Sequence, residues 1–269
     1  MSSDHILGSV LEQNNGVARD TDKDWAIIAS ENPYWGVISV DLFRGADLKP
    51  EAREQFFRSG DEFVANTIGY VTRHLLPGFK ITRALDFGCG VGRLLLPLAR
   101  ISQEVVGVDV APRMLEIARQ NLDAAGLSNV SLALGADALS RIEGEFDFIN
   151  SYIVFQHIAP ERGIPIMVNL LNKLRAGGVF SLQLTYAKER KFLAHEGAVA
   201  SYYRRSGTIM HDLVPTGAEL PEGTILMFDY DLNEVMLVVS RVAREPIMMV
   251  PTNHDGHIGV HLIGMKAQA

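Results

Sequence analysis

The sequence predicts an α/β fold built on a doubly wound parallel sheet. From Ile81 onward, short apolar runs alternate with amphipathic helical segments. A glycine-rich loop follows the first apolar run directly, and an acidic residue ends the second. Such alternation places helices on both faces of the sheet and connects parallel strands by right-handed crossovers. A ligand is then expected at the carboxyl ends of the strands.

Length and composition suit one large domain. The chain has 269 residues, of which 47% are hydrophobic and 21% charged, so it can bury a core without cross-links. Cys89 is the single cysteine, which excludes an internal disulfide. No apolar run is long enough for a membrane span, and the amino-terminal residues lack a signal-peptide pattern. We therefore expect a cytoplasmic protein without a membrane partner.

The net charge of −7 argues against broad, sequence-independent binding of nucleic acid. A small-molecule partner is expected instead. The sequence does not indicate an oligomeric state.

The amino-terminal part is expected to be an extension or cap over residues 1–60. The main domain then covers residues 61–269, beginning with a helix whose N-cap is Asp61. Phe63, Thr67, Val71 and Leu75 recur at helical spacing after it, and Pro77-Gly78 ends the helix.

The elements of the main domain follow in a regular order. Strands are expected at 81–87, 105–109, 129–134, 146–151 and 179–184, with helices at 93–100, 111–125 and 164–174 between them. The alternation lapses over residues 186–230, which are interpreted as an insertion over the strand ends. It resumes with a helix at 232–243, capped by Asp231, and strands near 246–250 and 257–265.

The loop between the first strand and its helix has the spacing G-x-G-x-G. Gly88, Gly90 and Gly92 allow a sharp turn and a close approach of the backbone to a ligand. Dinucleotide-binding enzymes use G-x-G-x-x-G, which would require glycine at position 93, and this position is Arg93. The spacing therefore disfavours a nicotinamide-dependent oxidoreductase.

Two acids follow at the ends of the next strands. Asp109 closes the second strand, where a carboxylate accepts hydrogen bonds from both hydroxyls of a ribose. Asp137 follows the third strand and is positioned to accept from an adenine amino group. The alternative is a generic tight turn with core aspartates.

Five segments together resemble the class I S-adenosylmethionine-dependent methyltransferases. They are residues 85–93, 106–114, 135–137, 146–151 and 174–178. The resemblance implies a Rossmann-like methyltransferase fold with seven strands, the last of them antiparallel. It also implies S-adenosyl-L-methionine as the cofactor.

The resemblance further implies the residues that hold this cofactor. Asp86 would support its ammonium group and Asp109 its ribose, while Val110 and Met114 would flank the adenine. The complete expected set is Asp86, Gly88, Cys89, Gly90, Asp109, Val110, Met114, Asp137, Ala138 and Ser151.

Methyl transfer to oxygen needs a general base close to the methyl group. The stretch after the fourth strand contains His157, the expected catalytic base, and Tyr152, an expected substrate contact. Further substrate contacts are expected from Tyr34 and Trp35, and from His195 and Tyr202 in a lid formed by 186–230. The alternatives are a packed or capping histidine, core aromatics and a solvated insertion.

No catalytic metal is expected. His254, His257 and His261 lie close together in the sequence, but Gly259 interrupts them and no cysteine is near. The Asp-Asn pair that cation-dependent methyltransferases carry after the fourth strand is absent.

The function expected from the sequence is transfer of a methyl group to a small molecule, such as a sugar or another hydroxylated metabolite. His157 and the polar insertion favour oxygen as the acceptor atom. The alternatives are N-methylation of a small amine and a catalytically silent protein that binds S-adenosylmethionine.

Overall fold

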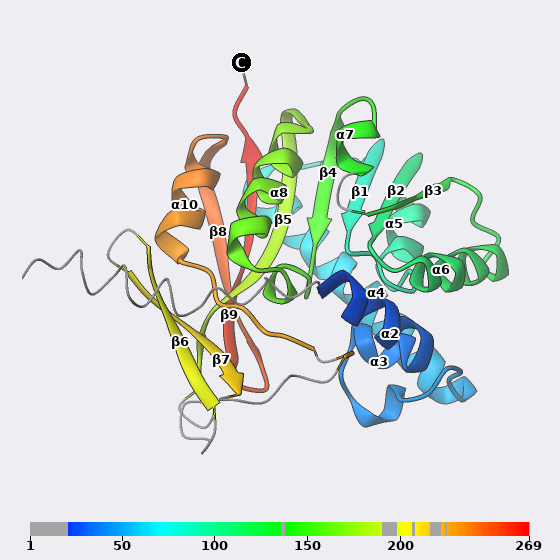
Figure 1. Cartoon of the computed structure of the whole chain (residues 1–269). Helices are drawn as coiled ribbons and strands as arrows, with labels where there is room; N and C mark the ends of the chain where they lie inside the picture. Colours follow the sequence, from blue (N-terminus) through cyan, green and yellow to red (C-terminus); the bar gives the residue numbers. More distant parts are fainter. Residues whose placement is uncertain are drawn as a thin grey trace, which may run out of the picture.

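The computed structural model describes residues 21–135, 138–189, 198–205, 208–215, 222–223 and 225–268. A seven-stranded sheet with the order β3-β2-β1-β4-β5-β9-β8 forms its centre, and helices cover both faces (Figure 1). The strands of this sheet are β1 Arg83–Phe87, β2 Glu104–Asp109, β3 Val130–Leu134, β4 Phe146–Ser151, β5 Leu174–Lys188, β8 Ala243–His254 and β9 His257–Lys266.

The pairing confirms the expected topology. β1 to β5 pair in parallel, whereas β9 is antiparallel to both β5 and β8. The strand order reverses between β1 and β4, so their carboxyl ends diverge into a crevice, as at the ligand sites of other open α/β sheets.

The helices form two layers and an amino-terminal cap. α8 Pro160–Asn172 and α10 Leu232–Ser240 pack on one face with Phe87 and Phe180, and α5 Leu95–Ile101 and α6 Pro112–Ala124 pack on the other. The remaining helices are α2 Thr21–Glu31, α3 Pro33–Val37, η1 Asp41–Phe43, α4 Pro50–Tyr70, η2 Val71–Leu75, α7 Ala138–Arg141 and η3 Phe155–His157. Within the described part of the chain, no helix is long and apolar enough to cross a membrane.

The expectation that Asp61 is a helix N-cap is wrong. α4 begins at Pro50, whose fixed φ suits the first helical position, and runs through Asp61 to Tyr70. Its buried face starts earlier than Phe63, with Ala52 and Phe56. The division of the chain after residue 60 therefore falls inside this helix, and Asp61 pairs with Arg100 on α5 at 2.8 Å.

The region after the fifth strand differs in part from the expectation. β5 continues to Lys188, so it reaches beyond residue 184, and 198–205 and 208–215 pair as the separate hairpin β6–β7 (β6 Ala198–Arg205, β7 Thr208–Pro215). Tyr202 lies in β6, with His211 as its Cα partner. His195 lies outside the described residues.

Residues 225–231 return along the strand ends. The Phe228 amide donates to the Gln156 carbonyl at 2.7 Å, and the Tyr230 amide donates to the Thr185 carbonyl at 2.8 Å. Asp231 then caps α10 by accepting from the Asn233 amide at 2.8 Å, which confirms the expected cap.

Candidate functional site

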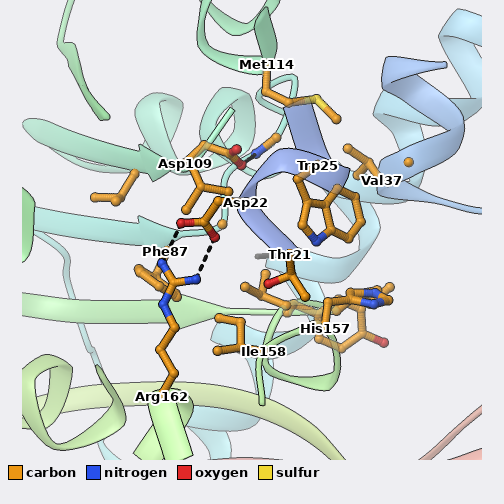
Figure 2. Close-up of a pocket in the computed structure, with 18 residues that line it drawn as sticks. Thr21, Asp22, Trp25, Val37, Phe87, Asp109, Met114, His157, Ile158 and Arg162 are labelled. Carbon is orange, nitrogen blue, oxygen red and sulfur yellow. Dashed lines mark hydrogen bonds and ion pairs between the residues drawn. The ribbon is translucent and has the colours of Figure 1, made fainter. Parts of the chain in front are cut away.

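A cavity of about 740 Å³, counting the space at its open mouth, lies at the point where the strand order reverses. α2, the β1 and β2 ends, and the loop after β4 surround it (Figure 2). Its lining consists of Thr21, Asp22, Trp25, Gly36, Val37, Phe87, Gly88, Gly90, Val108, Asp109, Val110, Met114, Tyr152, Ile153, Val154, His157, Ile158 and Arg162.

The glycine loop forms one wall of this cavity. Gly88, Gly90 and Gly92 have φ values of +75°, +52° and +90°, a region that glycine adopts at little cost. A Cβ added to Gly90 would lie 2.6 Å from Cγ2 of Val37, a distance that real Cβ atoms do not adopt. The loop therefore needs glycine here for its conformation and for the close approach of α3.

Asp109 is placed at the end of β2 so that its carboxylate joins two backbone segments. One oxygen accepts from the Gly90 amide at 2.8 Å and the other from the Ala111 amide at 2.9 Å. Burial raises the pKa of this carboxyl, and these amide hydrogen bonds act in the opposite direction. Val110 and Met114 follow it, and all three residues line the cavity. Their expected contacts with the cofactor stay predictions.

Cys89 and Ser151, both expected to contact the cofactor, are not among the residues that line the cavity. Cys89 is buried between the glycine loop and the sheet, and a Cβ built on Gly107 would lie 3.1 Å from its sulfur. Burial raises the pKa of its thiol well above the ordinary value, so the thiol stays protonated. Ser151 is fully buried in β4. The sequence identified the right loop and strand, but their packing turns these two side chains away from the cavity.

Asp137 lies outside the described residues, and Ala138 begins α7. Their expected contacts with the adenine stay predictions.

Asp86 stands behind the loop at one end of a buried row of polar side chains. The Asn150 amide donates to Asp86 at 2.8 Å, and the Ser181 hydroxyl donates to Asn150 at 2.8 Å. His261 Nε2 lies 2.8 Å from the Ser181 oxygen. The row crosses four neighbouring strands of the sheet.

The second oxygen of Asp86 has no hydrogen-bond partner among the described residues. Burial raises the pKa of this carboxyl to about 7, although Asn150 and Arg93 favour its charged form. Asp86 is therefore a buried acid with one free acceptor beside the glycine loop.

His157 lies in the cavity wall on η3, where the sequence predicted it. Its Nδ1 is 2.8 Å from the Leu226 carbonyl, so this nitrogen carries the proton and donates. Burial lowers the pKa of the imidazole to about 4, which makes it neutral at pH 7. Nε2 therefore presents a lone pair, 3.2 Å from the Gln156 amide nitrogen.

Trp25 is an aromatic residue of the cavity wall that sequence reasoning missed, and Phe87 is another. Trp25 lies over His157, with ring centroids 5.0 Å apart and planes at 68° (Figure 2).

Tyr34 and Trp35 are not among the residues that line the cavity, and their expected role as substrate contacts stays a prediction. Tyr34 is buried against Phe56. Trp35 packs under the Arg44 guanidinium, 4.3 Å from the ring centroid.

Tyr152 lines the cavity as expected and connects it to the β8–β9 hairpin. Its ring packs on Phe63 with centroids 4.0 Å apart, and its hydroxyl is 3.4 Å from Nε2 of His254. These contacts fix the orientation of the first side chain after β4.

Two charged residues join α2 to α8 across the cavity. Arg162 donates two hydrogen bonds to the Asp22 carboxylate, at 2.6 and 2.7 Å (Figure 2). Two residues further along α2, Asp24 accepts from the Gly223 amide at 2.8 Å. α2 is therefore fastened both to α8 and to the segment that leads back from the insertion.

The three carboxy-terminal histidines do not form a metal centre. His261 joins the polar row, and His254 contacts Tyr152. Among the described residues, no group of three or more histidine, cysteine or acidic side chains is arranged to hold a metal ion.

Comparison with known proteins identifies the domain that contains this cavity. Residues 84–178 match a family model described as a methyltransferase domain, and this stretch includes the glycine loop, Asp109 and His157. Over this stretch the chain is similar to the class I S-adenosylmethionine-dependent methyltransferases.

Named relatives agree with this family over part of their length. Ubiquinone biosynthesis O-methyltransferase from Roseobacter denitrificans is 35% identical over 101 residues, which are 38% of this chain and 40% of that protein. The enzyme of the same name from Ruegeria pomeroyi is 39% identical over 81 residues, 30% of this chain and 33% of that protein. The matches thus span 33–40% of the length of these two relatives.

Solved structures share the fold. Magnesium protoporphyrin IX methyltransferase from Synechocystis PCC 6803 gives a TM-score of 0.52 at 18% identity, covering 87% of this chain and 93% of that one. Phosphoethanolamine N-methyltransferase 1 from Haemonchus contortus gives 0.58 at 12% identity, covering 100% of this chain and 50% of that one. At these identities the likeness concerns the fold alone.

S-adenosylmethionine is the cofactor of this family, and the described residues suit it. The cavity has an apolar wall at Val110 and Met114 for an adenine, and the Asp109 carboxylate for a ribose. The free acceptor oxygen of Asp86 suits a cation beside the glycine loop.

Proposed function

We propose that this protein transfers the methyl group of S-adenosylmethionine to a hydroxyl oxygen of a small molecule. The observation that carries the proposal is that His157 and the glycine loop both lie in the wall of one cavity. Asp109 accepts a hydrogen bond from the Gly90 amide of this loop. The cofactor would bind to the loop, and the acceptor would lie between the cofactor and the imidazole.

The proposed cofactor-binding residues would each contact a different part of the cofactor. Asp109 would accept from the ribose hydroxyls, Val110 and Met114 would flank the adenine, and Gly88 and Gly90 would pass under the methionine part. Bound there, the cofactor supplies a methyl carbon that its sulfonium already activates. The protein must then mainly align the acceptor and exclude water.

His157 would accept the proton that the acceptor hydroxyl loses. Its neutral form is the one present at pH 7, and the Leu226 carbonyl holds the tautomer in which Nε2 is the acceptor. The new imidazolium charge appears as the sulfonium charge disappears, so the net charge of the site does not change. This balance lowers the cost of charging a buried histidine.

An oxygen acceptor fits the relatives better than a nitrogen acceptor. The curated relatives are named O-methyltransferases, and a neutral amine does not need the base that His157 would supply. No described contact favours a sugar over another hydroxylated molecule, so the proposed acceptor class is a small hydroxyl compound.

Binding and turnover test this function together. The purified protein should bind S-adenosylhomocysteine in calorimetry, with no comparable affinity for NAD, because Arg93 occupies the position of the third dinucleotide glycine. With methyl-labelled cofactor, it should label a member of a panel of phenols, catechols and sugar derivatives in preference to amines. Equal or tighter NAD binding, or binding without labelling of any acceptor, would contradict the proposal.

We further propose that α2 and the segment around 222–230 form the lid of the site, as the amino-terminal extension and the insertion were expected to do. Trp25 and Asp22 of α2 line the cavity, and Asp24 holds the Gly223 amide. The Leu226 carbonyl accepts a hydrogen bond from Nδ1 of His157. The two lid segments therefore contact each other and the proposed base.

Lid closure predicts a local change in hydrogen exchange. S-adenosylhomocysteine should slow exchange of the amides of α2 and of 225–230, because a ligand beneath them adds contacts and opposes opening. Exchange in α10, which lies outside the cavity lining, serves as the internal control and should not change. Equal exchange of α2 and 225–230 with and without the ligand would exclude the lid.

A further inference from the structure

The loop after β4 lines the cavity and contains a residue in a strained conformation. Ile153 has a φ of +61°, in the left-handed region that β-branched residues rarely adopt. Its amide donates to Oε1 of Gln183 at 3.0 Å. Since Ile153 lines the cavity, this hydrogen bond helps to hold part of the cavity wall in a conformation that isoleucine does not favour by itself.

Gln183 lies on β5 in a niche between strands. Its side chain is fully buried, and its Nε2 is 3.5 Å from the Thr252 hydroxyl on β8. β9 runs between these two strands. A Cβ built on Gly259 of β9 would lie 3.1 Å from Nε2 of Gln183 and 2.7 Å from the Thr252 hydroxyl. The lack of a side chain at Gly259 therefore leaves room for the Gln183 amide.

The Gln183 amide reaches the proposed base through a second buried glutamine. Its Nε2 donates to Oε1 of Gln156 at 3.3 Å, and Nε2 of Gln156 is 3.2 Å from Nε2 of His157. On the other side of the ring, Nδ1 of His157 is 2.8 Å from the Leu226 carbonyl. These contacts form one continuous hydrogen-bond relay, made of Ile153, Gln183, Gln156, His157 and Leu226.

The two ends of the relay determine its direction. A backbone amide only donates and a backbone carbonyl only accepts, so Ile153 must donate and Leu226 must accept. Each glutamine between them accepts through its oxygen and donates through its nitrogen. The Gln156 amide therefore donates to Nε2 of His157, which carries no proton, and its nitrogen also lies 3.7 Å from the Met227 sulfur, a weak acceptor.

We propose that Gln183 and Gln156 are positioning residues for methyl transfer, which hold His157 in the tautomer whose Nε2 accepts a proton. The acceptor hydroxyl would take the place of the Gln156 amide as the donor to Nε2. Its proton would move to Nε2 as the methyl–sulfur bond breaks and the methyl–oxygen bond forms. The inference rests on the proposed function, since it concerns the base of the same reaction.

The competing interpretation is that the two glutamines only satisfy each other's polar groups in the interior. Loss of stability does not separate the two interpretations, because removal of either buried amide leaves a partner unsatisfied. They differ in whether Gln183 acts on His157 through Gln156. If it does, its effect on the imidazole must disappear when Gln156 is absent.

Nitrogen NMR of the ligand-free wild type, with isotope-labelled histidine, tests the relay without a change in its members. The His157 signals are those missing from the spectrum of His157→Ala. At pH 7 they should show a protonated Nδ1 and an unprotonated Nε2. A neutral ring with its proton on Nε2 would overturn the proposal.

Methionine variants test the dependence, because methionine has a side chain of similar length to glutamine but no amide. Gln183→Met frees the Gln156 amide to turn its carbonyl towards Nε2, which favours the protonated ring. The pKa of His157, followed by NMR, should then rise from about 4 to about 5, the effect of one hydrogen bond. In a protein that already carries Gln156→Met, the same substitution should not change this pKa further.

Other groups that act on His157 stay the same in these variants. Among the described residues, His254 and His257 of the β8–β9 hairpin also act on its pKa, and the Trp25 ring packs on it from α2. Thr252→Val is the matched control, because it removes a hydrogen bond in the same niche but no member of the relay. It should keep the wild-type tautomer and the wild-type pKa of His157.

Turnover links the relay to the reaction. Either methionine variant should lower kcat by about tenfold, and the double variant should be no slower, because both substitutions act on one tautomer. The Kd of S-adenosylhomocysteine should stay unchanged in all of them.

An equal rise of the His157 pKa with and without Gln156 would overturn the proposal, as would kcat losses that multiply in the double variant. The wild-type spectrum does not depend on any relay variant folding. If it shows the expected tautomer but no acceptor is methylated, the proposed function fails while the relay stands, so the two failures are distinguishable.

Discussion

Replacing His157 with alanine should lower kcat by about 10²–10⁴-fold, the usual contribution of a general base. The imidazole lies in the cavity wall and is neutral at pH 7, and its Nε2 would accept the proton in place of its hydrogen bond from the Gln156 amide. Steady-state turnover with the hydroxyl acceptor, compared between variant and wild type, measures the effect. The affinity for S-adenosylhomocysteine should change much less than kcat, since the histidine acts on the acceptor.

His157→Gln is the control for packing, because glutamine keeps a polar side chain of similar reach beside Trp25. If His157 is the base, this variant should be as slow as His157→Ala. A glutamine variant with wild-type turnover would show that the histidine only shapes the cavity.

The pH profile gives a second check on the same residue. The lowered pKa of about 4 means that the imidazole is already deprotonated at mildly acidic pH. At saturating cofactor, kcat/KM for the acceptor should therefore stay flat between about pH 5.5 and 8, without a fall near the ordinary histidine pKa. An acidic limb near pH 6.5 would contradict the environment described for His157.

Asp109→Ala should raise the Kd of S-adenosylhomocysteine by about a hundredfold. Hydrogen bonds to a charged group contribute roughly 1.5–3 kcal/mol each, and two bonds to a ribose add less than their sum. The same carboxylate accepts from the Gly90 amide, so its removal also frees the loop that would carry the methionine part. Calorimetric titration measures the change.

Glu104→Gln is the matched control for this prediction. Glu104 stands at the other end of β2, half-exposed and paired with Arg83, so it tests loss of an acid from the same strand. It should bind S-adenosylhomocysteine as the wild type does. An unchanged Kd for Asp109→Ala, with a folded protein, would refute the ribose assignment.

The glycine loop and the acid after it could be predicted because their signals are local. The three positive φ values fall at Gly88, Gly90 and Gly92, where the sequence demands them. Asp109 lies at the carboxyl end of a strand whose apolar pattern is unambiguous. Each position depends on the conformation of a few neighbouring residues, and parallel strands bring their carboxyl ends to one edge of the sheet.

The choice among aromatic residues in the amino-terminal segment could not be predicted. Trp25 lines the cavity, whereas Tyr34 and Trp35 pack elsewhere. Which of them faces the cavity depends on how α2 and α3 dock on the sheet. The Asp22–Arg162 pair that fastens α2 joins residues 140 positions apart, a separation that no local pattern reveals.

By itself, the sequence determined the alternation of strands and helices, the ligand edge of the sheet, the glycine loop, and the positions of Asp109 and His157 after their strands. These features follow from hydrophobic periodicity and from the backbone freedom of glycine, which act over short stretches of chain. Tertiary structure alone decided the protonation of His157 and the free acceptor of Asp86. It also decided the burial of Arg93, because desolvation and hydrogen bonding depend on side chains that distant segments bring together.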